Sequence, residues 1–171
     1  MYLRIIVLVL LMIGGAMANA EESKEYRVVI PEERHTIVEF KQNGLPGVAT
    51  INSALVEFEP KVVFAWHLSI MINAQGLEDN KMPTPDEQKV LDKFEDELAP
   101  IIKANGNALF LGRVTNDGWR ELIYRIYDPE PVHEYLQGLI SSKKHLRPFD
   151  YRIDPDENWE KAQWHINAVR P

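Results

Sequence analysis

The alternation of strand-type and helix-type sequence patterns from residue 62 onwards constrains the fold of this chain more than any other feature. Residues 62–72 carry an apolar side chain at every even position, and this two-residue period predicts a β-strand with one face toward a core. A helix start follows, in which Thr84 is the N-cap, Pro85 is the first helical residue and Glu87 completes a capping box. Apolar residues then recur at helical spacing as far as Ile102. The sequence therefore predicts a long strand followed by an amphipathic helix.

Residues 108–127 predict a β-hairpin. Its turn is Asn116-Asp117-Gly118, because an Asp-Gly pair tolerates the positive φ that a tight hairpin requires. If all three residues form the loop, Arg113 lies opposite Glu121 across the two strands. An ion pair at such a position contributes about 0.2–1 kcal/mol. We therefore expect Arg113 and Glu121 to share one face of the sheet.

A second helix start completes a recognisable order of elements. Asp128 and Pro129 form a cap followed by a proline, and residues 149–154 alternate like a half-buried strand. The order from residue 62 is therefore β-α-β-β-α-β, which is that of the split βαβ unit, or ferredoxin-like domain. The predicted fold class is α+β, with two helices on one face of a four-stranded antiparallel sheet. We expect this domain to occupy residues 61–171.

Residues 21–60 predict a β-rich N-terminal extension that packs on this domain. Strand-type segments lie at 26–30 and 35–41, residues 42–47 are predicted to be a loop from their Gly and Pro content, and a short C-terminal helix is predicted near 158–165. The sheet face opposite the two long helices would carry side chains too apolar to face water together. They are Leu109, Leu111, Ile123 and Tyr127. We expect the extension to cover them, with the C-terminal helix or a second copy of the chain as alternatives.

The first twenty residues are typical of a secretory signal peptide. Arg4 gives a positive start, residues 5–13 are an apolar run, and Ala18-Asn19-Ala20 matches a cleavage site. The apolar run is shorter than the roughly 20 residues of a membrane-spanning helix. We therefore expect a periplasmic or secreted protein, cleaved after Ala20 and without a stable membrane span. The alternative is an N-terminal anchor that is kept.

Charge and cysteine content exclude several functions. The formal net charge is −7, which argues against binding to the phosphates of a nucleic acid. The chain has no cysteine, which excludes thiolate nucleophiles, thiolate metal ligands and disulfides. The five histidines lack the spacing of metal ligands, and no glycine-rich phosphate loop is present. We expect neither a metal site nor a cofactor.

Several short motifs, taken in order, resemble a known family. They are Trp66-His67-Leu68-Ser69-Ile70, Met82-Pro83-Thr84, Phe94-Glu95-Asp96, residues 120–124 followed by Asp128-Pro129, residues 149–156, and Trp159-Glu160. Over about residues 33–160 the chain is similar to a bacterial family of uncharacterised domains, number 695 among the domains of unknown function. Members of this family are sometimes fused to a domain that resembles the protein regulator of ribonuclease E activity, which is also ferredoxin-like. The family has no established catalytic residues, so the resemblance implies none here.

One face of the predicted sheet gathers polar side chains into a candidate site. The residues are His67, Ser69, Arg113, Glu121, Arg125, Asp150 and Arg152. Histidine and glutamate are suited to proton transfer, and arginines are suited to holding an anion. The alternative is an ion-pair network that serves the fold alone.

Two functions follow from this arrangement. The first is a non-catalytic binding or interaction module with a protein or peptide partner. Its predicted binding residues are Arg113, Arg125, Arg152 and Trp119. Trp119 at the hairpin turn, together with Trp164, would then be exposed. The alternative is a periplasmic hydrolase-like enzyme that uses His67 and Glu121. We favour the binding module, with no nucleic-acid partner and with a homodimer left open.

Overall fold

The computed structural model of the chain describes residues 27–170. The predicted signal peptide and its cleavage site after Ala20 lie outside these residues, as does Tyr26 at the start of the strand expected at 26–30. Residues 27–30 do not form a strand, so that part of the expectation is wrong.

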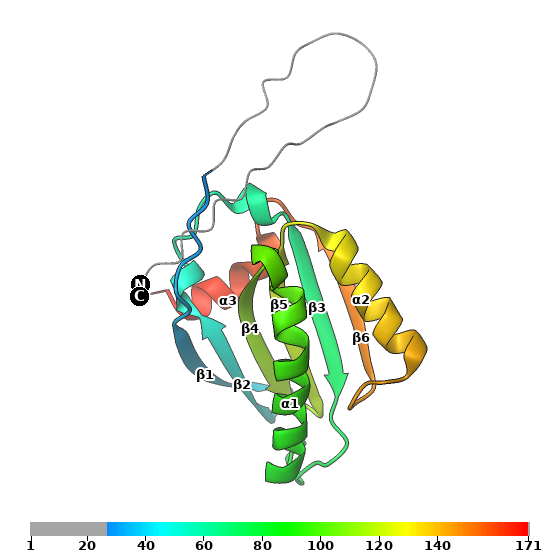
Figure 1. Cartoon of the computed structure of the whole chain (residues 1–171). Coiled ribbons are helices and arrows are strands. Elements are labelled where there is room, and N and C mark those ends of the chain that lie inside the picture. Colours follow the sequence, from blue (N-terminus) through cyan, green and yellow to red (C-terminus); the bar gives the residue numbers. More distant parts are fainter. Residues whose placement is uncertain (1–26, 171) are drawn as a thin grey trace.

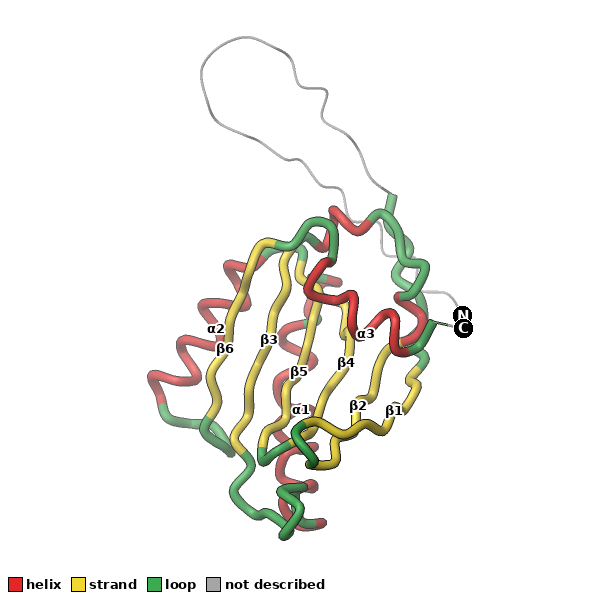
Figure 2. Tube along the Cα trace, turned by 180° about the vertical axis from the view of Figure 1, so that it is seen from behind, coloured by secondary structure: helices red, strands yellow, loops and turns green. Residues whose placement is uncertain are grey.

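Six strands form one antiparallel sheet in the order β1-β2-β4-β5-β3-β6. The strands are β1 His35–Gln42, β2 Leu45–Asn52, β3 Trp66–Asn73, β4 Ala108–Asn116, β5 Trp119–Ile126 and β6 Phe149–Pro155. The helices are α1 Pro85–Ile102, α2 Pro129–Ser142 and α3 Gln163–Ala168. Figure 1 shows α1 and α2 across one face of the sheet, and Figure 2 shows α3 on the opposite face, which we call the back face.

The mixed α+β fold, the antiparallel sheet, the two long helices and the short C-terminal helix are confirmed. The expected number of four strands is wrong, because the β1–β2 hairpin joins the sheet at the edge of β4. The expected loop at 42–47 is also wrong. The turn consists of Asn43 and Gly44, both at positive φ, and Phe40 pairs with Gly47 across the hairpin.

The start of α1 forms as its sequence predicts, with one difference. The Thr84 hydroxyl accepts a hydrogen bond from the backbone N–H of Glu87 at 3.3 Å. The Glu87 carboxylate does not complete a capping box; it accepts hydrogen bonds from Arg147 at 2.7 and 2.8 Å and from the Gln75 N–H at 3.0 Å. Glu87 therefore ties the start of α1 to the segment that precedes β6.

The strand expected at 62–72 begins only at Trp66, because residues 61–64 form a turn of 3-10 helix. The carbonyl of Phe64 accepts hydrogen bonds from the side chains of Arg125 and Trp159, which holds this turn against the C-terminal segment. From Leu68 to Ile72 the even positions are buried under α1 and α2, as the alternation predicts.

A second core lies on the back face, and both ends of the described chain contribute to it. Leu109, Leu111 and Ile123 of the sheet pack against apolar residues of two covering segments. These are Val28, Leu55, Phe58, Val63 and Phe64 on one side, and Trp159, Ala162 and Ile166 on the other. The N-terminal extension therefore shares the cover with the C-terminal segment, while its β1–β2 hairpin lengthens the sheet.

The β4–β5 hairpin differs from its predicted register by one residue. Asp117 and Gly118 both take positive φ, so these two residues suffice for the turn and Asn116 pairs with Trp119. A bulge between Phe110 and Gly112 changes which side chains of β4 face α1. The expected Arg113–Glu121 pair is therefore wrong.

Arg113 lies on the helix-covered face instead. Its guanidinium pairs with Glu95 of α1 at 3.1 Å.

Candidate functional site

The polar residues of the back face form two separate groups. One is a closed network around Arg125, next to the C-terminal segment. The other surrounds a pocket between the tip of β1, the strands β4 and β5, and α3.

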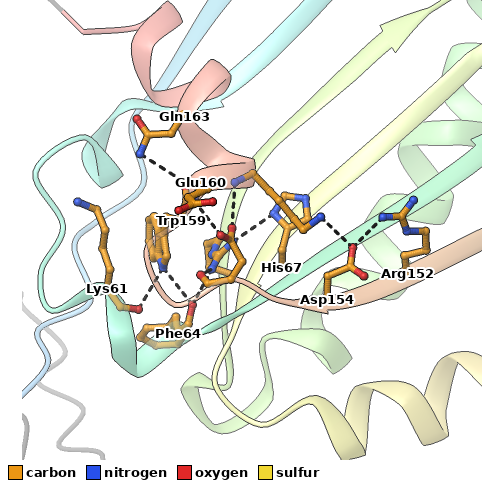
Figure 3. A network of polar contacts seen from close by, with 11 residues as sticks. Lys61, Phe64, His67, Arg152, Asp154, Trp159, Glu160 and Gln163 are labelled. Atoms are coloured by element: carbon orange, nitrogen blue, oxygen red, sulfur yellow. Dashed lines mark hydrogen bonds and ion pairs between the residues drawn. The ribbon is translucent and has the colours of Figure 1, made fainter.

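Arg125 is the centre of the closed network, and its side chain is fully buried. Its Nη1 donates to the Asp156 carboxylate at 2.6 Å, and its Nη2 donates to the carbonyl oxygens of Asp156 at 2.5 Å and Phe64 at 3.1 Å. The guanidinium carbon also lies 4.8 Å from the centre of the Trp159 ring. Figure 3 shows Phe64 and His67, at and just before the start of β3, close to Trp159 of the C-terminal segment. The network joins β5 to both segments.

His67 belongs to this network, and its residue is only 7% exposed. Its Nδ1 lies 3.2 Å from Arg125 Nη1, which can only donate, so the ring nitrogen accepts. Burial, together with the charge of Arg125, lowers the pKa of His67 to about 4. The ring is therefore neutral at neutral pH, and its Nδ1 is engaged as an acceptor.

Arg152 lies at the exposed margin of the network. It pairs with Asp154 at 2.9 Å, and Asp154 also lies 3.4 Å from Lys161. Exposed pairs of this kind contribute at most about 1 kcal/mol. Arg152 is therefore accessible to solvent, whereas the predicted binding residue Arg125 is not.

The pocket has a volume of about 480 Å³. Its lining residues are Phe40, Lys41, Gln42, Val114, Glu121, Trp164 and His165. We call it the β1–α3 pocket. Figure 2 shows α3 on the back face of the sheet. Val114 of β4 and Glu121 of β5 pair with each other on this face and form the floor of the pocket.

Two aromatic rings form the side of the β1–α3 pocket. Phe40 and Trp164 meet edge to face with their centroids 5.7 Å apart. Phe40 lies directly over Gly47, where an added Cβ would come within 2.3 Å of the ring. The absence of a side chain at Gly47 therefore lets the Phe40 ring reach α3.

Glu121 supplies the carboxylate of the pocket. Its Oε1 accepts a hydrogen bond from the Ser69 hydroxyl at 2.5 Å. Its Oε2 makes no hydrogen bond within residues 27–170, so one carboxylate oxygen keeps its full acceptor capacity.

His165 supplies a buried imidazole to the same lining. Its residue is 9% exposed, and its Nδ1 makes no hydrogen bond within the described part of the chain. Burial lowers the pKa of His165 to about 4, against a smaller opposite effect of the Ala162 carbonyl. The ring is therefore neutral at neutral pH.

The predicted site is partly assembled. His67, Ser69, Glu121, Arg125, Asp150 and Arg152 lie on the back face as predicted, and Arg113 does not. His67 and Glu121 are not brought together: His67 pairs with Arg125, four residues along β5 from Glu121. Trp119 and Trp164 are both exposed as expected, at 39% and 49%, but only Trp164 lines the β1–α3 pocket.

Sequence reasoning missed Phe40, Gly47 and His165 as parts of one site. A signal for the first two was present, because Asn43-Gly44 is a strong two-residue hairpin turn and fixes Phe40 opposite Gly47. No local pattern places His165 in the same lining as Glu121, since this depends on how the chain returns after β6.

Two features are absent from residues 27–170. No cluster of three or more histidine, aspartate or glutamate side chains is arranged to hold a metal ion there. Within the same range, no helix combines the length and apolar character needed to cross a membrane.

Comparison with known proteins identifies the family. The model of the family of unknown function DUF695 matches residues 36–163, which confirms the resemblance seen in the sequence motifs. No curated protein and no solved structure matches the chain. The chain belongs to the DUF695 family.

Proposed function

We propose that this member of the DUF695 family is a non-catalytic binding module whose ligand, free or presented by a peptide, occupies the β1–α3 pocket. The observation that most directly supports this proposal is the pocket itself. It has about 480 Å³ of space, aromatic side chains along one side, and a carboxylate with a free oxygen. A mostly apolar hollow of roughly 300–1,000 Å³ with a few polar groups is the usual form of a ligand site.

The geometry favours binding over the hydrolase alternative. Hydrolysis by His67 and Glu121 needs both side chains at one substrate. His67 is instead buried against Arg125, while Glu121 accepts from Ser69 and faces the β1–α3 pocket. His67 and Glu121 therefore belong to separate sets of contacts and do not face a common substrate.

Two finer assignments accompany this proposal. The strand order β4-β5-β3-β6, with α1 and α2 on one face, supports a ferredoxin-like unit within residues 66–155. The apolar run and the Ala18-Asn19-Ala20 motif support export to the periplasm or the medium. Mass spectrometry of the protein from cell fractions tests export: the expected product begins at Glu21 and is absent from the cytoplasm.

A fragment screen by ligand-observed NMR tests the binding function. We expect several aromatic or amphipathic fragments to bind protein expressed from the full-length sequence. Trp164→Ala should weaken these fragments at least tenfold, because Trp164 forms the side of the pocket. Trp119→Ala is the matched control, since Trp119 is similarly exposed but lies outside the lining.

Equal loss of binding in both tryptophan variants would contradict the assignment of this pocket. The binding function would be contradicted if the screen found no fragment whose affinity is lowered by Trp164→Ala.

A further inference from the structure

The unused hydrogen-bonding capacity of the β1–α3 pocket indicates which chemical group it recognises. The Glu121 Oε2 is an acceptor only, and the Ser69 hydroxyl donates to the other carboxylate oxygen. A neutral imidazole has one protonated and one unprotonated nitrogen. Because Nδ1 of His165 is buried, Nε2 is the second acceptor that His165 offers, when Nδ1 carries the proton. A ligand that donates several hydrogen bonds from one atom fits this pair of acceptors.

The charges around the pocket favour a cation. Glu121 is the acidic residue of the lining. Lys41 also lines the pocket, but side chains alternate along β1, which puts Lys41 on the face opposite Phe40. Arg152 is near enough to interact with Glu121, but its guanidinium is already paired with Asp154. A carboxylate on a ligand would be repelled by Glu121.

The aromatic side of the pocket supports the same conclusion. The faces of tryptophan and phenylalanine rings attract cations, and tryptophan does so most strongly. Phe40 and Trp164 lie beside the Glu121 carboxylate in one lining. The low pKa of His165 keeps its ring uncharged at neutral pH, so the ring does not repel a cation.

We propose that the β1–α3 pocket recognises a protonated amine, with the ammonium group donating to Glu121 Oε2 and to Nε2 of His165 beside the rings of Phe40 and Trp164. The inference rests on the proposed binding function and assigns its ligand class. The same ammonium group occurs in a free amine, at the N-terminus of a peptide and on a lysine side chain.

Calorimetric titration with three probes of matched shape tests the charge preference. Phenethylammonium, phenethyl alcohol and 3-phenylpropionate are titrated at pH 7 and low ionic strength into protein from the full-length sequence. We expect phenethylammonium to bind at least tenfold more tightly than the alcohol, and the carboxylate not to bind. Tighter binding of the alcohol or of the carboxylate would overturn the inference but would leave the binding function standing.

Isosteric variants tie the preference to the pocket. Glu121→Gln keeps the shape and removes the charge, so the tenfold preference for the amine over the alcohol should disappear. Asp150→Asn removes an exposed charge from the same sheet face, outside the pocket, and should keep the preference. If Glu121→Gln fails to fold by circular dichroism, Trp164→Leu replaces it and should weaken the amine at least fivefold. An unchanged preference in a folded Glu121→Gln protein would overturn the inference.

Three further probes distinguish the sources of the amine. A tripeptide with a free N-terminus, its N-acetylated form, and a peptide acetylated at its N-terminus with one central lysine are titrated in parallel. Binding of the first alone indicates an N-terminal amine, and binding of the third indicates a lysine side chain. Binding of phenethylammonium alone indicates a free small amine. Failure of every amine in the two series would overturn the inference.

Discussion

At the scale of single residues, Asp156 is the partner that makes the burial of Arg125 tolerable. Its carboxylate and carbonyl oxygens accept from both terminal nitrogens of the guanidinium. It also accepts from the backbone N–H groups of Glu160 at 2.7 Å and Lys161 at 3.1 Å, which fixes the turn that leads to α3. One side chain therefore neutralises a buried charge and shapes the C-terminal segment.

Asp156→Ala should destabilise the protein strongly. The substitution leaves the buried Arg125 charge without its partner, and removing one member of a buried ion pair costs about 3–5 kcal/mol. Urea unfolding measures the loss. Asp154→Ala is the control, because its partner Arg152 is exposed, and it should cost no more than about 1 kcal/mol. Similar losses for the two variants would show that the network does not depend on its buried pair.

The two buried histidines should make stability depend on pH. His67 and His165 have pKa values of about 4 in the folded protein, and an unfolded chain has about 6.5 for histidine. The unfolded chain therefore binds protons more readily. Their contribution to the free energy of unfolding is complete above about pH 6.5. It falls progressively as the pH drops toward 4, by up to roughly 3 kcal/mol for each histidine.

Urea unfolding at pH 7 and at pH 4.5 measures this fall. In a variant with His67→Gln and His165→Gln, the decrease in unfolding free energy between the two pH values should be much smaller. His133→Gln is the control, because His133 is exposed, and this variant should show the same decrease as the unmodified protein. An undiminished fall in the double variant would assign the pH dependence to other groups.

At the scale of elements, local signals predicted most of the helices and strands. Thr84 and Pro85 begin α1, and Asp128 caps α2 by accepting from the Glu130 N–H at 3.1 Å, as their sequences indicate. The registers were harder, because the bulge at Phe110–Gly112 reverses the faces of later β4 residues and no sequence period reveals it. Gly112 faces the Thr50 carbonyl, where an added Cβ would lie only 2.6 Å away, so the neighbouring strand requires this glycine.

Gly47→Ala should damage the β1–β2 hairpin and the pocket together. The added methyl group overlaps the Phe40 ring, which must then leave its position against Trp164. We expect a loss of about 1–3 kcal/mol in unfolding free energy, together with weaker ligand binding. Gly138→Ala is the control: nothing lies within 4 Å of the added Cβ in α2, so stability should rise by about 0.5–1 kcal/mol. Unchanged stability and binding in Gly47→Ala would contradict the role given to the Phe40 ring.

At the scale of the whole molecule, the order β-α-β-β-α-β predicted the layer of α1 and α2 on the sheet. It did not predict how the back face is covered. Its apolar residues required a cover, and the sequence left three candidates. The structure uses two of them together, because Trp159 packs on Phe58 with ring centroids 5.5 Å apart, joining the two covering segments. The candidate site depends on similar contacts between distant segments, which explains why Phe40 and His165 were not predicted as parts of it.

Removing the C-terminal cover should open the back-face core. A chain that ends at Pro155 lacks Asp156, Trp159 and α3, and it leaves Leu109, Leu111 and Ile123 partly uncovered. We expect increased fluorescence of a dye that binds exposed apolar surface, together with a broad unfolding transition. A chain that ends at Ala168 retains α3 and should behave like the full chain. A sharp transition without dye binding in the shorter chain would show that the cover is dispensable.

The origin of the pocket's parts has a consequence for the time at which it can first form. Its floor comes from the middle of the sequence, at Val114 and Glu121, whereas its side requires Phe40 from the N-terminal part and Trp164 from near the end. A ribosome therefore completes the floor well before the last part of the side emerges. A product that ends after β6 and before α3 carries all six strands without a closed pocket. Occupancy of the pocket thus reports that synthesis has passed Trp164.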